Sequence, residues 1–95
     1  MRWTWDSRKE RGNRQAHGLS FETASRVFDD PLALSRPDDT TEEERWQTVG
    51  GIDGVIAFVV HTWPTPDRSG EEVGRIISAR KATAHERKAY EEGEF

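Results

Sequence analysis

The side chains of this chain that can do chemistry are arginines, lysines, histidines, carboxylates and one tyrosine. The absence of cysteine excludes a thiol nucleophile, a thiolate metal site and a disulfide. The three histidines, at positions 17, 61 and 85, lack the paired spacing of a metal site, and no glycine-rich phosphate loop or G-x-S-x-G motif occurs. This set of residues suits cleavage of RNA without a metal or other cofactor. In that reaction the neighbouring 2′-hydroxyl is the nucleophile, and the protein supplies proton transfer and positive charge.

The charges of the chain are unevenly spread along it. The formal net charge is -4, but residues 1–28 carry six bases and three acids, and residues 75–88 carry five bases and one acid. These two basic regions either meet in space and attract a polyanion or form ordinary solvated faces, and charge alone leaves both open. The acidic run of residues 38–44 is either a solvated loop or a segment that repels RNA and directs it elsewhere.

One histidine and two arginines are the strongest candidates for this chemistry. His17 follows a basic helical segment, whose C-terminus favours a protonated imidazole, so it either transfers a proton or caps the last carbonyls. Alternation along the strand expected at residues 73–80 places Arg75 and Arg80 on opposite faces. Because Arg80 lies at the strand end, it either turns toward the same phosphate as Arg75 or pairs with Glu86.

Periodic patterns predict the elements that must position these side chains. Alternation of Trp3 and Trp5 with polar residues predicts a strand over residues 2–6, and a helix over residues 9–17 ends at Gly18. A short helix follows, capped by Ser20, with Phe21, Ala24, Val27 and Phe28 on its buried face. The first half of the expected sheet is a short strand at 32–36, a turn at 37–41 and a strand at 42–49 in which Trp46 and Thr48 share a face. The remaining elements are a hairpin loop at 50–54, a strand at 55–63, a loop at 65–70, a strand at 73–80 and a helix at 82–92.

The order of these elements predicts the fold class. The strand over residues 55–63 is apolar on both faces, so it belongs in the middle of a sheet. We therefore expect a single α+β domain over residues 1–95, with a small, largely antiparallel β-sheet and flanking helices. Trp63 is the tryptophan expected to be exposed, His61 is expected at a sheet edge or in the core, and His85 is expected on the surface.

The chain shows no signal for a membrane or for export. It begins without an apolar leader, and its longest apolar run, residues 55–60, is far shorter than a membrane span. The absence of cysteine is compatible with a reducing compartment. We therefore expect a soluble, cytoplasmic protein that makes no contact with a membrane.

Several short motifs follow one another in a specific order and spacing. They are Trp5-Asp6, Lys9 with Asn13, His17-Gly18-x-Ser20-Phe21-x-x-Ala24, Phe28-Asp29, Glu44-Arg45 with Gly50, His61-Thr62 after the apolar strand, the run of residues 75–82, and Glu86-Arg87 with Tyr90. Together they resemble the BrnT family of toxins from bacterial type II toxin-antitoxin pairs, and the resemblance spans most of the chain.

The resemblance implies a RelE-like ribonuclease fold and a toxin that cleaves RNA and so inhibits translation and growth. It also implies a cognate BrnA-like antitoxin that neutralises the toxin and carries the DNA-binding part, so that operator DNA is bound only through the antitoxin. The expected assembly is a heterotetramer of toxin and antitoxin.

The matching motifs also imply site residues. Residues carried over as catalytic are His17, Arg75, Arg80 and Glu86, and residues carried over as RNA-binding are Lys9, Arg14 and Lys81. Two positions differ from the family pattern: Ala16 stands where lysine is common, and Trp63-Pro64 stands where an arginine is frequent. The alternative is therefore a non-catalytic or degenerate interaction module that acts only in antitoxin binding and operon autorepression.

Overall fold

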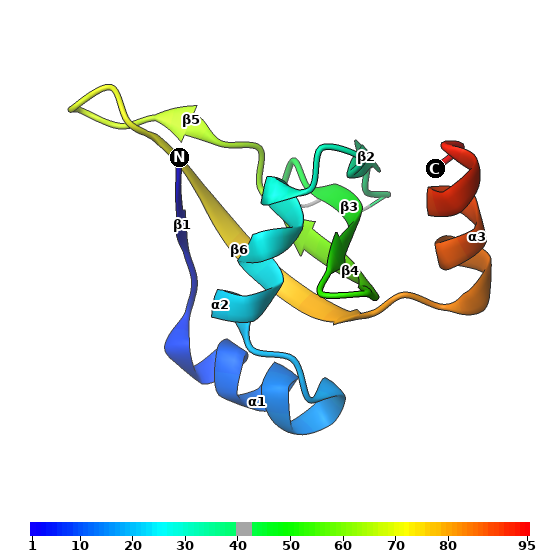
Figure 1. Cartoon of the computed structure of the whole chain (residues 1–95). Coiled ribbons are helices and arrows are strands. Elements are labelled where there is room, and N and C mark those ends of the chain that lie inside the picture. Colours follow the sequence, from blue (N-terminus) through cyan, green and yellow to red (C-terminus); the bar gives the residue numbers. More distant parts are fainter. Residues whose placement is uncertain (40–42) are drawn as a thin grey trace.

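The computed structural model describes residues 1–39 and 43–95 and has an α+β fold with a mixed sheet flanked by helices (Figure 1). The strand order is β1-β6-β4-β3-β2, and β5 also pairs with β6. β1 runs parallel to β6, and the other pairs are antiparallel. The predicted fold class is confirmed, and the RelE-like label stays a prediction. The elements are β1 (Arg2–Thr4), α1 (Ser7–His17), α2 (Phe21–Ala24), the 3₁₀ helix η1 (Ser25–Asp29), β2 (Leu34–Pro37), β3 (Trp46–Ile52), β4 (Val55–His61), β5 (Thr65–Pro66), β6 (Glu72–Lys81) and α3 (Ala84–Glu92).

β4 lies in the middle of the sheet, between β3 and β6, as its two apolar faces predict. One face of the sheet, here called the helix-covered face, carries Ala57 and Val59, which pack in one core with Phe21 of α2 and Val27 of η1. His61 is 1% exposed on the same face, so the expectation of a core histidine is the correct one of the two. The short second helix thus closes the core, because its apolar side chains recur at helical spacing.

Capping residues fix both ends of α1. The Asp6 side chain accepts hydrogen bonds from the backbone N–H groups of Arg8 and Lys9, at 2.9 and 3.0 Å. This N-cap makes the helix begin at Ser7, two residues before the predicted start. The helix ends at Gly18 in the left-handed conformation, with φ of 71°, as predicted.

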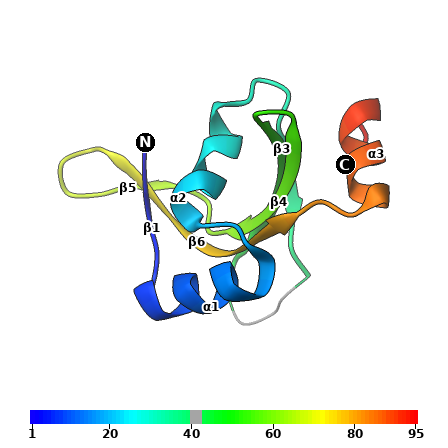
Figure 2. The ribbon, with the colours of Figure 1, turned by 60° about the horizontal axis from the view of Figure 1, so that its bottom comes forward.

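Asn13 joins α1 to the edge of β6. Its side-chain amide nitrogen donates to the Ala79 carbonyl at 2.7 Å, and its amide oxygen accepts from the Ala79 N–H at 3.1 Å. β1 pairs with residues 73–75 of β6, so the edge beyond them needs another partner, which Asn13 provides. As a result α1 lies beside β6 (Figure 2).

The hairpin loop predicted at residues 50–54 is shorter in the structure. The turn consists of Asp53 and Gly54, whose φ angles of 49° and 85° suit a two-residue hairpin, and the preceding glycines belong to β3. Position 50 of this strand requires glycine, because a β-carbon there would lie 3.0 Å from the β-carbon of Val27. The glycine pair thus serves close packing of η1 on the sheet, which the sequence pattern does not reveal.

A β-bulge at Ile77 changes the alternation of β6. Pairing with β4 is regular at Ile76 and resumes at Ser78, so that Ile77 is an extra residue. One extra residue reverses the face on which the following side chains lie. Arg75 and Arg80 therefore share the face opposite the helix-covered one, and the prediction that they lie on opposite faces is wrong.

Other boundaries also differ from those expected. Thr65–Pro66 forms β5 within the predicted loop of residues 65–70, because it pairs with the start of β6. α3 begins two residues later than predicted, after a capping box formed by Thr83 and Glu86. Residues 40–42, which belong to the predicted turn, the predicted strand of residues 42–49 and the acidic run, lie outside the described residues.

Candidate functional site

Three cations from separate parts of the chain line one cavity of about 240 Å³, here called the cationic cavity. Lys9 comes from the first turn of α1, Arg45 directly precedes β3, and Arg75 comes from β6. The Asp6 cap fixes the helical turn that carries Lys9. Arg75 lies before the bulge at Ile77, in the part of β6 where the alternation of side chains is still regular. Sequence reasoning named Lys9 and Arg75 as site residues and did not name Arg45, although Glu44-Arg45 is among the motifs that carry the family resemblance.

A single carboxylate oxygen joins two of these cations. Oε1 of Glu43 accepts from Nη2 of Arg75 at 2.6 Å and from Nε of Arg45 at 3.2 Å. The Arg75 side chain is still 48% exposed and that of Glu43 is 38% exposed, so solvent reaches the contact. Two guanidinium groups that share one anionic oxygen are arranged as they would be around a phosphate oxygen.

The two other charged side chains of the cationic cavity, Asp6 and Lys9, differ in whether they already have a bonding partner. The backbone N–H of Lys9 donates to Asp6 and, with that of Arg8, lowers the pKa of Asp6. This carboxylate is therefore committed to the helix cap. The Lys9 ammonium makes no ion pair within residues 1–39 and 43–95, so it is available to an incoming anion.

Arg80 and Glu86 form a closed pair that joins β6 to α3. Nη1 and Nη2 of Arg80 donate to the two carboxylate oxygens of Glu86, at 2.7 and 3.0 Å. Glu86 also accepts from the Thr83 N–H at 2.9 Å, and the Arg80 guanidinium lies 4.2 Å from the ring centre of Phe58. Burial opposes ionisation of Glu86, but the hydrogen bonds from Arg80 and Thr83 lower its pKa overall. The expected alternative for Arg80, pairing with Glu86, is confirmed.

His17 and Lys81 line a separate cavity of about 230 Å³ at the β3–β4 hairpin. The imidazole lies at the exposed C-terminus of α1, where the cap bond runs from Gly18 N–H to the Arg14 carbonyl. Arg14 itself extends to 3.8 Å from Glu10 on the same helix. The cavity thus combines an imidazole with an ammonium group, but it contains no arginine among its described residues.

The predicted site residues are therefore brought together as pairs, not as one cluster. α1 and β6 lie side by side, with Lys9 and Arg75 lining one cavity and His17 and Lys81 lining another. The contact of Asn13 with β6 lies between these two cavities. Arg80 with Glu86 forms the third group, and none of the described cavities contains all four residues carried over as catalytic.

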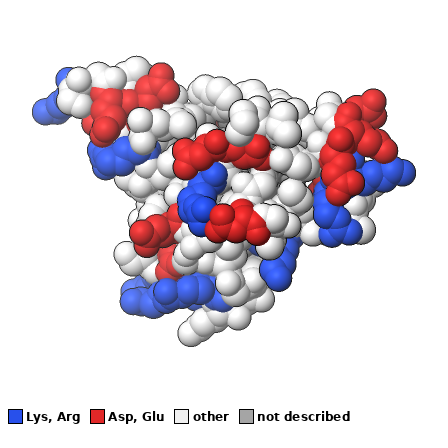
Figure 3. All heavy atoms as spheres, viewed as in Figure 1, with Lys and Arg blue, Asp and Glu red and all other residues white. Residues whose placement is uncertain are grey.

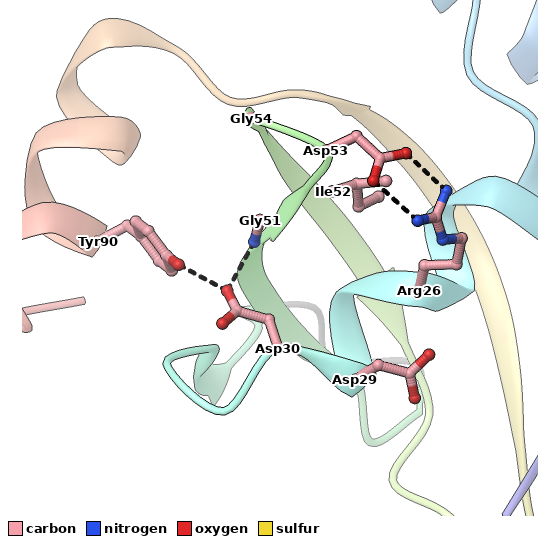
Figure 4. Close-up of a pocket in the computed structure, with 8 residues that line it drawn as sticks. All are labelled: Arg26, Asp29, Asp30, Gly51, Ile52, Asp53, Gly54 and Tyr90. Atoms are coloured by element: carbon pink, nitrogen blue, oxygen red, sulfur yellow. Dashed lines mark hydrogen bonds and ion pairs between the residues drawn. The ribbon is translucent and has the colours of Figure 1, made fainter.

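The largest described cavity, about 380 Å³, is acidic (Figure 4). Oδ2 of Asp30 accepts from the Tyr90 hydroxyl at 2.6 Å and from the Gly51 N–H at 2.7 Å, and these bonds lower the pKa of Asp30. On the other side of the cavity, Arg26 donates to both carboxylate oxygens of Asp53, at 2.9 and 3.0 Å. The first contact holds α3 against β3, and the excess of carboxylates makes the cavity unsuitable for a phosphate.

Basic and acidic side chains are interspersed on the surface of the molecule. Figure 3 shows Lys and Arg side chains beside Asp and Glu side chains over the face that it presents. In the described part of the chain, no group of three or more His, Cys, Asp or Glu residues is arranged to hold a metal ion. Across residues 1–39 and 43–95, no helix is both long enough and apolar enough to cross a membrane.

Comparison with known families adds an independent finding. A family model described as ribonuclease toxin, BrnT, of type II toxin-antitoxin system matches residues 5–86. This range includes the three cations of the cationic cavity, Lys9, Arg45 and Arg75, and also the Arg80–Glu86 pair. No curated protein matches the chain.

Proposed function

The chain belongs to the BrnT family of ribonuclease toxins of type II toxin-antitoxin systems, and from this premise we propose that it cleaves RNA without a metal at the cationic cavity. The observation that carries the proposal is the convergence of Lys9, Arg45 and Arg75 on one cavity. These cations come from different elements, so the fold itself brings them together. A phosphodiester can take the place that the Glu43 carboxylate oxygen now holds between the two guanidinium groups.

The proposed step is transfer of the phosphorus from one ribose oxygen to another. The 2′-oxygen bonds to phosphorus, the bond to the 5′-oxygen breaks, and a 2′,3′-cyclic phosphate and a 5′-hydroxyl end result. Arg45 and Arg75 stabilise the negative charge on the non-bridging oxygens, and Lys9 gives a proton to the departing 5′-oxygen. The proton of the 2′-hydroxyl passes to water at the open side of the cavity.

A second candidate site is the cavity that His17 shares with Lys81. There the imidazole would transfer the proton and the ammonium would hold the phosphate, with Arg14 as a further contact for RNA. Arg80 and Glu86 would serve either site only through stability, by joining β6 to α3, since their polar atoms are already bonded to each other. Substitution of His17 with alanine separates the two candidates, because it affects only the second.

The partner follows from the family, since a type II toxin acts with an antitoxin. We propose that a BrnA-like antitoxin neutralises this chain, that the two form a heterotetramer in the cytoplasm, and that the antitoxin alone carries the contact with operator DNA. Free toxin would then cut RNA, inhibit translation and stop growth.

The test is cleavage of RNA by the purified chain, with and without EDTA. We expect new RNA ends, 2′,3′-cyclic phosphate and 5′-hydroxyl, at a protein concentration far below that of RNA, with equal rates in EDTA. Loss of cleavage in EDTA would contradict the proposed metal independence. Saturable, salt-sensitive RNA binding without new ends would favour the alternative of a non-catalytic module.

A further inference from the structure

A second surface of the molecule is apolar where the proposed RNA site is cationic. Trp3, Phe28, His61 and Trp63 line a cavity of about 260 Å³ with Glu72 among its other residues, here called the Trp63 groove. It opens near the start of β1 and the segment that follows β4. Aromatic rings make up half of its lining residues, and Trp3 and Phe28 among them pack against the core on the helix-covered side of the sheet.

The exposed side chains of the Trp63 groove are unusual for a free surface. Trp63 is 50% exposed and Met1, also in the lining, is 65% exposed. The Trp63 ring is held in place by Trp46, with ring centres 4.6 Å apart. A large, fixed and half-exposed indole next to a cavity is the typical anchor of a protein interface.

The charges of the groove favour a protein over a nucleic acid. None of the described residues that line it is Lys or Arg, so a phosphate backbone finds no partner there. His61 adds no positive charge near neutral pH, because burial lowers the pKa of its imidazole. Its Nδ1–H donates to the Thr62 carbonyl at 2.9 Å, so Nε2 accepts from the Thr48 hydroxyl.

Glu72 gives the groove an unpaired negative charge. The neighbouring acids Glu71 and Asp67 both contact Arg2, at 3.0 and 3.5 Å. Glu72 has no ion-pair partner within the described ranges, although it lies in the same hairpin. A carboxylate left free at the rim of an apolar groove is complementary to a basic side chain of a partner.

We propose that the Trp63 groove holds an apolar side chain of the antitoxin, and that a Lys or Arg beside that side chain pairs with Glu72. The inference rests on the proposed toxin function, because it takes the antitoxin as the occupant. The groove and the cationic cavity share one strand pair: His61 lines the groove and pairs with Ile76, which lines the cavity. The groove opens on the helix-covered side of the sheet, whereas the Arg75 side chain lies on the opposite face, so the two surfaces are separate.

The test measures binding of the full chain to the product of the adjacent reading frame, which serves as the probe, by isothermal titration calorimetry. We expect Trp63→Ala to weaken binding at least about ten-fold, because it removes the anchor. We expect Glu72→Lys to weaken it about five-fold at low salt, with a smaller difference at high salt. The matched control is Leu32→Ala, which removes a side chain that is 68% exposed outside the groove and leaves the affinity unchanged.

RNA cleavage by each variant without the probe keeps this inference separate from the proposed function. We expect Trp63→Ala and Glu72→Lys to cleave RNA at the wild-type rate at a temperature where circular dichroism shows both variants folded. Trp63→Ala should unfold at a lower temperature than the wild type, because it loses the contact with Trp46. Unchanged affinity in both folded variants would overturn the docking proposal, as would failure of the wild-type chain to bind the probe. Lost cleavage with unchanged affinity would overturn it too, since the groove would then serve RNA. If the wild-type chain cleaves no RNA but Trp63→Ala still weakens binding of the probe, the docking proposal is supported and the proposed nuclease function is contradicted.

Discussion

Arg75 and Arg80 lie on one strand and one face of the sheet, yet their surroundings differ. Arg80 gives both terminal nitrogens to Glu86, whose side chain is 12% exposed, and lies against Phe58. Arg75 shares one oxygen of Glu43 with Arg45 and opens into a cavity with a further cation. Residue type and face are therefore not enough to assign a role, because the role depends on which donors are already used.

From this difference we propose that Arg80 serves stability and that Arg75 serves RNA cleavage. A bidentate pair with a mostly buried carboxylate leaves few donors for a ligand and joins two elements. An exposed contact between a carboxylate and two cations contributes little to folding and is easily replaced by a phosphate. The predictions below test this division, beginning with the largest expected effect.

Arg75→Ala should lower the rate of RNA cleavage by about 100-fold, because it removes a charge that stabilises the transition state. The free energy of unfolding should stay the same within about 0.5 kcal/mol, since the lost contact is exposed. Cleavage assays and chemical denaturation of the same preparation measure both quantities. A variant that cleaves at the wild-type rate would remove Arg75 from the site.

Arg80→Ala should lower the free energy of unfolding by about 2 kcal/mol, because Glu86 loses its partner at a mostly buried position. At a temperature where the variant is folded, its cleavage rate should stay close to that of the wild type. The matched control is Arg87→Ala, which removes an exposed arginine of α3 and should leave the stability unchanged. Equal stability of the two variants would show that the closed pair does not hold α3.

Tyr90→Phe removes the other contact that anchors α3 and should cost about 1 to 2 kcal/mol of stability. The hydrogen bond from the Tyr90 hydroxyl lowers the pKa of Asp30 in the folded protein. The stability that this bond contributes is therefore fully present above the ordinary aspartate pKa of about 3.9, and it is lost as the pH falls through the lowered pKa of the folded state. Denaturation at pH 7 and at acid pH should show a difference between wild type and variant that shrinks in acid. A difference that grows in acid would contradict this sign.

Glu43→Gln should have the smallest effect, about three-fold tighter binding of RNA. It removes the negative charge that competes with phosphate for Arg45 and Arg75, and an exposed ion pair is worth little. Fluorescence anisotropy with labelled RNA at several salt concentrations measures this change. Weaker binding would mean that Glu43 positions the arginines for RNA and does not compete with it.

Local patterns were sufficient for most of the fold. The central place of β4 follows from apolar residues on both faces, and the end of α1 follows from Gly18. The extent of β3 did not follow, because glycines usually indicate a loop, whereas Gly50 lies in the strand and is glycine because Val27, distant in sequence, packs closely on it. Contacts of this kind exist only once the elements are packed.

The candidate site likewise could be predicted only as far as local sequence patterns allow. Lys9 and Arg75 were named from motifs, but the bulge at Ile77 depends on the pairing with β4 and cannot be read from alternation within one strand. Arg45 was recognised as part of a motif but not as a site residue, because nothing local in the sequence links it to Lys9 or Arg75. Only the fold places it beside Lys9 and Arg75.

The most direct test of the account compares the initial rates of RNA cleavage of Arg75→Ala and Arg80→Ala, at a temperature where circular dichroism shows both variants folded. The account predicts that Arg75→Ala is slower by at least about ten-fold, because Arg75 lines the cationic cavity and Arg80 does not. Equal rates, or a slower Arg80→Ala variant, would contradict the assignment of RNA cleavage to the cationic cavity.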